Sequence, residues 1–183
     1  MNVPNFITML RILMVPLVVI FLMEGKTQAA FLVFVLAGIS DGLDGSIARA
    51  FKQKTVLGAY LDPIADKLLL NSSFVGLAIF GMLPGWLAVL VVSRDIIILG
   101  GIGILLISGK ELAIRPSLYS KVTTLVQLGT ICLFLGQGYL GNHLFFQIYL
   151  VYLTSFFTVL SGLHYIAAGF RILGCPCRID DHN

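Results

Sequence analysis

Short polar connections divide the chain into six long apolar segments, and this pattern restricts its fold more than any other feature. Hydrophobic residues make up 58% of the 183 residues, and charged residues only 11%. A soluble domain of this size would expose too much apolar surface. The segments lie at roughly 5–23, 29–50, 58–81, 84–107, 119–139 and 143–170, each near the ~20 residues that a helix needs to cross a bilayer.

The segments predict an all-α, polytopic membrane protein, a bundle of about six transmembrane helices. Barrel strands would alternate in polarity over ~10 residues, and these continuous apolar runs do not. We expect one membrane domain over residues 1–183, with a short C-terminal tail from about residue 172. The first segment lacks a basic leader and a small-residue cleavage site, which favours a retained helix over a removed signal.

The distribution of charge predicts the orientation in the membrane. Basic residues surround the second and fourth connections and the tail, whereas the first, third and fifth connections carry no net positive charge. By the positive-inside rule, both termini and the even-numbered connections are then cytoplasmic. A net charge of +3 by itself suggests no nucleic-acid partner. The basic residues are Arg49, Lys52, Lys54, Lys110, Arg115, Lys121, Arg171 and Arg178.

Four carboxylates lie where the second segment ends and the third begins, in the stretch DGLDGSIARAFKQKTVLGAYLDPIAD. Asp41 and Asp44 are three apart, and Asp62 and Asp66 are four apart, so each pair shares one face of a helix. Carboxylates in a membrane segment are costly and usually mark function. Because the connection between the two segments is short, the chain turns back antiparallel, and the two pairs can face each other at the cytoplasmic boundary.

Such a cluster indicates a site for divalent cations. Four nearby carboxylates repel one another unless cations neutralise them, and their oxygens suit two Mg²⁺ or Mn²⁺ ions. Paired ions stabilise the attacking and leaving oxygens of a phosphoryl displacement. Arg49 lies one further turn along the helix of Asp41 and Asp44, where it can hold a diphosphate. Small residues at Gly45, Ala48 and Gly58 let a nucleotide or a neighbouring helix approach closely.

Read as D-x2-D-G-x2-A-R-x8-G-x3-D-x3-D, the spacing is complete in this chain and resembles the signature of the CDP-alcohol phosphatidyltransferases. Members of that family are membrane enzymes of six spans, usually homodimers, that move a phosphatidyl group from CDP-diacylglycerol to an alcohol and release CMP. The resemblance implies an integral membrane enzyme using Mg²⁺ or Mn²⁺. It implies that Asp41, Asp44, Asp62 and Asp66 ligate the metals, with Asp66 also the catalytic base on the acceptor hydroxyl.

The resemblance also implies a site for the nucleotide and its diphosphate. Its motif residues in this chain are Gly45, Ala48, Arg49 and Gly58. The segment Pro4-Asn5-x-x-Thr8-x-x-Arg11 looks like the first helix of the family, which lies beside the nucleotide, and this adds Asn5 and Thr8.

The acceptor pocket is expected to be basic, because the acceptors used by similar family members are anionic. Arg115 and Lys121, at the cytoplasmic ends of the fourth and fifth helices, are the candidates for holding an acceptor phosphate. Lys121 is followed by Thr123, Thr124 and Gln127, which predict a polar face on the fifth helix.

Two branches of the family resemble this chain in different places. The N-terminal segment and Phe157–Arg171 look like phosphatidylglycerophosphate synthases, whose acceptor is glycerol-3-phosphate. Ser93-Arg94-Asp95 and Ser120-Lys121 look more like cardiolipin synthases, whose acceptor is phosphatidylglycerol; the first branch usually has Gly-Lys where this chain has Ser120-Lys121. We expect glycerol-3-phosphate as the acceptor, with phosphatidylglycerol as the alternative.

Other interpretations remain open from the residues alone. A cation-coupled transporter also uses buried carboxylates, but its acidic residues would lie near the midplane of broken helices. Arg94 and Asp95 fit either a structural contact within the membrane or the acceptor site, and as adjacent helical residues each is expected to need its own partner. Three cysteines are too few for a disulfide framework, and the Cys175/Cys177 tail favours free thiols over a metal site.

Overall fold

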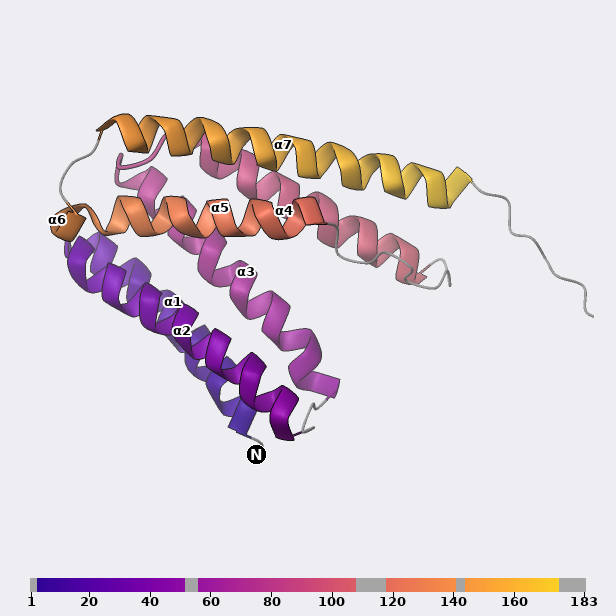
Figure 1. Ribbon diagram of the computed structural model, residues 1–183, viewed down its shortest axis with the longest axis horizontal. Helices are drawn as coiled ribbons and strands as arrows, with labels where there is room; N and C mark the ends of the chain where they lie inside the picture. Colours follow the sequence, from indigo (N-terminus) through magenta and orange to yellow (C-terminus); the bar gives the residue numbers. More distant parts are fainter. Residues whose placement is uncertain (1–2, 52–55, 108–117, 141–143, 175–183) are drawn as a thin grey trace, which may run out of the picture.

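The computed structural model describes residues 3–51, 56–107, 118–140 and 144–174, with side chains chiefly within 9–40, 65–101, 120–139 and 145–167. This part of the chain is all-α, as predicted (Figure 1). Its helices are α1 (Val3–Met23), α2 (Thr27–Phe51), α3 (Val56–Ile79), α4 (Gly85–Ile107), α5 (Leu118–Leu135), α6 (Gln137–Leu140) and α7 (Leu144–Gly174).

α7 extends to Gly174, beyond the sixth apolar segment, and the other long helices coincide with their segments except near the end of the fifth. There the chain leaves α5 after Leu135, passes through a turn at Gly136, and forms the four-residue α6. Glycine and the following polar Gln137 weaken the helix at this point, although the apolar pattern continues beyond it. The Gln28 side chain at the start of α2 donates a hydrogen bond to the Gly138 carbonyl, which holds α6 against α2.

Two glycines in the left-handed conformation end α1 and α3. Gly25 and Gly81 both have φ of 70°, which an L-residue with a Cβ adopts only at a cost. In each case the following amide reaches back five residues, from Lys26 to the Phe21 carbonyl and from Met82 to the Leu77 carbonyl. This pairing satisfies the last carbonyls of the helix and reverses the chain within a few residues.

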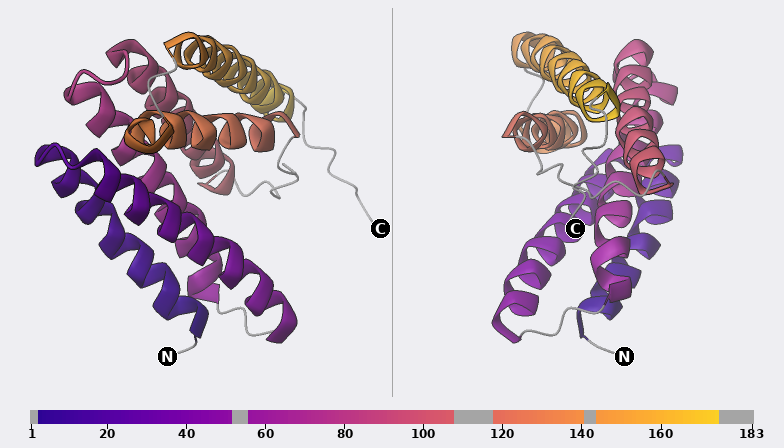
Figure 2. Two further views of the ribbon diagram at one scale, coloured as in Figure 1. Left: turned by 60° about the vertical axis from the view of Figure 1, so that its left-hand side comes forward. Right: turned by 90° about the vertical axis from the view of Figure 1, so that its right-hand side faces the viewer.

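The helices form two groups that are linked through α3 and through α2, which packs against α5 and α6. α1 packs against both α2 and α3, whereas α7 packs against α4 and α5. α3 also packs against α4 and α5, and so connects the groups. The α1–α2 pair and α7 lie on opposite sides of the molecule in both rotated views (Figure 2).

The apolar core lies toward the end of the molecule where α1, α3 and α5 finish (Figure 1). Phe34, Phe74, Leu77, Leu87 and Leu135 are among its fully or almost fully buried side chains. The buried charged side chains in the described part, Arg11, Arg94 and Asp95, instead lie on turns of α1 and α4 that are farther from this end. In the described part, the buried ionisable groups are therefore separated from the apolar core.

Large apolar side chains also cover the outer surface of every long helix. Phe145 is 91% exposed, and Ile79, Val89 and Leu125 are each exposed by more than two thirds. Among the described side chains, the stretch Phe145–Ala167 is long and apolar enough to cross a membrane by length and composition. Shorter apolar stretches accompany it at Met9–Met23, Thr27–Ser40 and Ser120–Leu135.

Candidate active site

The two halves of the acidic motif lie at the same end of the molecule as the start of α1 (Figure 1). Asp41, Asp44, Gly45, Ala48 and Arg49 belong to the last turns of α2, and Gly58, Asp62 and Asp66 to the first turns of α3. The side chains of residues 41–64 lie outside the described part, so Asp66 is the one aspartate of the motif whose contacts are defined. Asn5 and Thr8 belong to the first turns of α1, and their side chains likewise lie outside it.

Asp66 is held by an arginine from the first helix. Arg11 Nη1 donates a hydrogen bond to Asp66 Oδ1 over 2.6 Å, and the two groups form an ion pair. The arginine side chain is 1% exposed, whereas the aspartate is 41% exposed. Arg11 therefore approaches from inside the bundle, and the carboxylate remains accessible at its surface.

Arg11 was not among the residues predicted for the site, although it ends the N-terminal motif. The sequence did contain a sign of its role, because an arginine inside an apolar segment needs a counter-charge within the bundle. Asn5, Thr8 and Arg11 follow at intervals of three and so lie along one side of α1. The Arg11–Asp66 pair brings this helix to the third-helix half of the acidic motif.

A second charged cluster joins α3 to α4 directly beside the acidic motif. Lys67, the residue after Asp66, forms an ion pair with Asp95 Oδ1. Arg94 Nη1 donates to the same oxygen over 2.7 Å. Both Arg94 and Asp95 are 3% exposed, so these charges are buried within the bundle.

Arg94 and Asp95 each have a partner on another helix, as expected, but they also bind each other, which was not expected. Their helical positions are about 100° apart, but the long arginine side chain can fold back to the shorter aspartate. Arg94 also donates to Ser120 Oγ on α5 over 2.9 Å and to Ser161 Oγ on α7 over 2.7 Å. Lys67 and Ser161 were not predicted, because their partners lie 28 and 67 residues away in sequence.

The polar side chains of α5 mainly face α7. Thr123 donates to the Phe157 carbonyl over 3.1 Å, and Gln127 donates to Thr158 over 3.3 Å. Lys121 is exposed instead. Within the predicted polar face, Thr123 and Gln127 are therefore used to bind the neighbouring helix, whereas Lys121 is exposed.

Several predicted residues lie outside the described part of the chain. Arg115, the other candidate for the acceptor pocket, is one of them, and so are Cys175 and Cys177. Cys132 on α5 is a free, partly buried thiol.

The donor set of the acidic motif fits divalent metal ions by its chemistry. All four side chains offer carboxylate oxygens, which Mg²⁺ and Mn²⁺ prefer. The described member, Asp66, is partly exposed and so accessible to an ion. Among the described side chains, no group of three His, Cys, Asp or Glu residues gathers; three of the four aspartates lie outside that set. The metal centre therefore stays a prediction.

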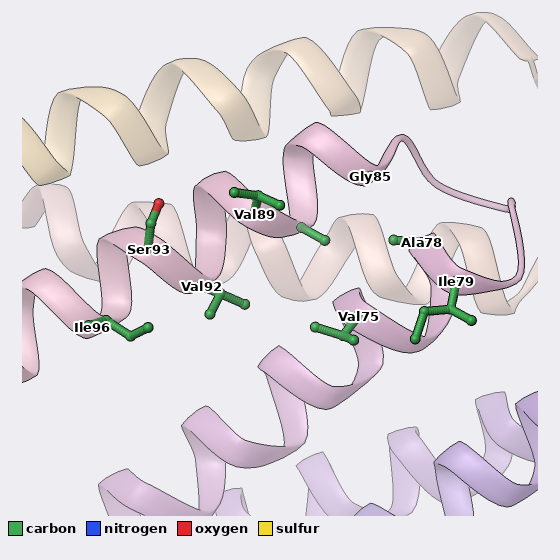
Figure 3. A pocket seen from close by; sticks show the side chains of 9 residues that line it. Val75, Ala78, Ile79, Gly85, Val89, Val92, Ser93 and Ile96 are labelled. Carbon is green, nitrogen blue, oxygen red and sulfur yellow. The ribbon is translucent and has the colours of Figure 1, made fainter.

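A pocket of about 530 Å³ lies between the second half of α3 and the first half of α4 (Figure 3). Its lining is apolar except for Ser93, and it includes Val75, Ile79, Val89 and Ile96. Val75 is nine residues along α3 from Asp66, roughly 13 Å of helix. The pocket therefore has the character of an apolar packing surface and offers no group for acid, base or metal chemistry.

Comparisons with known proteins agree with the motif. Residues 1–160 match the CDP-alcohol phosphatidyltransferase family. A probable phosphatidylglycerophosphate synthase of Mycobacterium tuberculosis is 33% identical, with 94% of this chain and 84% of the relative covered. A CDP-diacylglycerol–glycerol-3-phosphate 3-phosphatidyltransferase of Aquifex aeolicus is 32% identical, with 94% and 98% covered. A probable CMP-forming cardiolipin synthase of Drosophila melanogaster is 35% identical, with 91% and 57% covered.

The family match, over a chain whose described part is an all-helical bundle, identifies a phospholipid-synthesising transferase of the membrane. The chain belongs to the CDP-alcohol phosphatidyltransferase family. It is therefore an enzyme, and the transporter interpretation is no longer needed.

Proposed function

We propose that this enzyme transfers the phosphatidyl group of CDP-diacylglycerol to glycerol-3-phosphate and releases CMP. The observation that carries the proposal is the Arg11–Asp66 pair. It holds an accessible carboxylate of the family motif at the end of the bundle that contains both halves of the motif. The guanidinium orients the carboxylate, and an accessible carboxylate of fixed orientation can accept a proton from an acceptor hydroxyl.

The proposed reaction is a single in-line displacement. The acceptor oxygen forms a bond to the β-phosphorus of CDP-diacylglycerol, the phosphorus atom attached to diacylglycerol, and the bond from this phosphorus to the CMP oxygen breaks. Asp66 accepts the proton of the acceptor hydroxyl. Asp41, Asp44, Asp62 and Asp66 would hold two Mg²⁺ or Mn²⁺ ions, which when bound neutralise the charge of the diphosphate. Asn5, Thr8, Gly45, Ala48, Arg49 and Gly58 are the proposed contacts of the nucleotide and diphosphate.

The six long helices are proposed to span the membrane, with the acidic motif at the cytoplasmic face. Exposed apolar side chains on all of them support burial in lipid, since water would disfavour so large an apolar surface. The basic connections support the orientation. A site at this boundary suits a substrate that combines acyl chains with a cytidine diphosphate. A homodimer, usual in the family, is proposed as the assembly.

Glycerol-3-phosphate is the first choice of acceptor because the chain matches glycerol-3-phosphate transferases over nearly their whole length. Arg115 and the exposed Lys121 are the proposed ligands of its phosphate. Phosphatidylglycerol is the second candidate, because the chain also matches a CMP-forming cardiolipin synthase. Ser120, which distinguishes this chain from the glycerol-3-phosphate branch, accepts a hydrogen bond from the buried Arg94.

The test is purified enzyme in mixed micelles with CDP-diacylglycerol, Mn²⁺ and a panel of acceptors, with the lipid product identified by its mass. Phosphatidylglycerophosphate formed from glycerol-3-phosphate supports the first acceptor. Cardiolipin formed from phosphatidylglycerol, with no product from glycerol-3-phosphate, replaces it by the second. An Asp66→Asn enzyme serves as the control, because its amide oxygen can still accept the hydrogen bond from Arg11.

A further inference from the structure

Two adjacent residues of α3, Asp66 and Lys67, are tied to different helices. Asp66 accepts a hydrogen bond from Arg11 on α1, and Lys67 forms an ion pair with Asp95 on α4. Successive residues of an α-helix point about 100° apart. The two ion pairs therefore act on α3 at the same level but in different directions, which opposes rotation of the helix about its axis.

Asp95 connects Lys67 to a wider polar junction. Asp95 Oδ1 forms ion pairs with both Lys67 and Arg94. Arg94 also donates hydrogen bonds to Ser120 and Ser161. The junction thus joins α3 to α4, α5 and α7, whereas Arg11 joins α3 to α1. Lys67 is 27% exposed and Asp95 is 3% exposed, so this link from α3 is mostly shielded from solvent.

We propose that Lys67 and Asp95 are a positioning pair, which sets the rotation of α3 and thereby the direction in which Asp66 points. The inference rests on the proposed function, in which Asp66 is the base. A small rotation of α3 would leave Asp66 on the helix but move its carboxylate away from the acceptor hydroxyl. Misplacement of a reacting group by about 1 Å can reduce a rate by about 100-fold.

A purely structural role for the pair predicts a different result. In that case its loss would lower the thermal stability of the bundle without a selective effect on turnover. Thr130 and Thr154, whose hydroxyls hydrogen-bond over 2.7 Å between α5 and α7, provide a matched control. Both threonines are fully buried and lie outside the proposed catalytic and binding groups.

The experiment compares wild type with Lys67→Met, Lys67→Arg and Thr130→Val in micelles that contain CDP-diacylglycerol and the preferred acceptor. Lys67→Met is expected to lower kcat about 10- to 100-fold while the KM for CDP-diacylglycerol changes less than about threefold. Lys67→Arg, which keeps the charge, is expected to recover most of the lost kcat. Thr130→Val is expected to lower the unfolding temperature and to keep kcat within about threefold of wild type.

A further variant covers the case in which Lys67→Met does not fold. Lys67→Met/Asp95→Asn removes both charges of the pair, and the new amide oxygen can still accept the hydrogen bond from Arg94. It is expected to accumulate in the membrane and to show the same loss of kcat. Wild-type kcat in the double variant would overturn the positioning role, as would an equal loss in Thr130→Val. Absence of CMP release by wild type with every acceptor would overturn the proposed function itself.

Discussion

Arg11 and Asp66, 55 positions apart in the sequence, form a hydrogen-bonded ion pair of 2.6 Å between the first and third helices. The pair brings the N-terminal motif to the second half of the acidic motif. It also leaves the two partners in unlike environments, because the guanidinium is buried and the carboxylate is partly exposed.

Replacing Arg11 by methionine is expected to weaken both folding and catalysis, because Asp66 then loses a charged donor that orients it. The free energy of unfolding should fall by about 1.5–3 kcal/mol, the range for a hydrogen bond to a charged group. Arg11→Lys should restore only part of the activity, since an ammonium does not reproduce the planar guanidinium. Lys26→Met, which removes an exposed ion pair with Glu24, is the control and should change stability by less than about 0.5 kcal/mol. An Arg11→Met enzyme with unchanged stability and turnover would contradict the role of the pair.

Asp66→Asn should abolish CMP release while the protein remains inserted in the membrane. Loss of a general base reduces a rate by about 10²- to 10⁴-fold, and the loss of a metal ligand adds to this. Cell fractionation measures insertion, and radiolabelled CDP-diacylglycerol measures CMP release. Turnover close to that of wild type would remove Asp66 as the base.

Removal of divalent cations should stop turnover without unfolding the helices. Excess chelator is added to the purified enzyme, and CMP release and circular dichroism are followed together. Mg²⁺ or Mn²⁺ added back should restore activity, since carboxylate oxygens bind either ion. Sustained CMP release in chelator would argue against a two-metal site.

Lys121→Ala should raise the KM for the acceptor more than the KM for CDP-diacylglycerol. A lost charge-assisted hydrogen bond to a phosphate corresponds to about a tenfold change in affinity. The side chain is exposed, so little effect on folding is expected. Leu125→Ala, one turn further along α5 and 69% exposed, is the matched control. A change confined to the KM for CDP-diacylglycerol would move Lys121 out of the acceptor pocket.

The sequence predicted the six long helices well because helix formation in an apolar segment depends on local composition. The predicted starts and ends of the first four segments agree with the helices within about two residues. The break at Gly136 was missed, since the apolar pattern runs through it. The sequence also predicted that Asp62 and Asp66 share a helix, because they are four residues apart, and both belong to α3.

The sequence did not predict the contacts between residues that are far apart in the chain. Arg94 and Asp95 were expected to need separate partners, and each has one on another helix, but the hydrogen bond between the two was not predicted. Thr123 and Gln127 were predicted to share a polar face with Lys121; the structure shows that these two bind α7, whereas the lysine is exposed. Each outcome depends on which helix packs alongside, and helix packing is set by the whole bundle.

The sequence by itself determined the apolar helices, the spacing of the aspartates and the family, because these depend on residue type and on intervals along one chain segment. The tertiary structure decided that Arg11 binds Asp66 and that Lys67 binds Asp95. Ion pairs between helices need two side chains to meet at one level and on facing sides. That condition is met only when the helices have packed, and so no local pattern contains it.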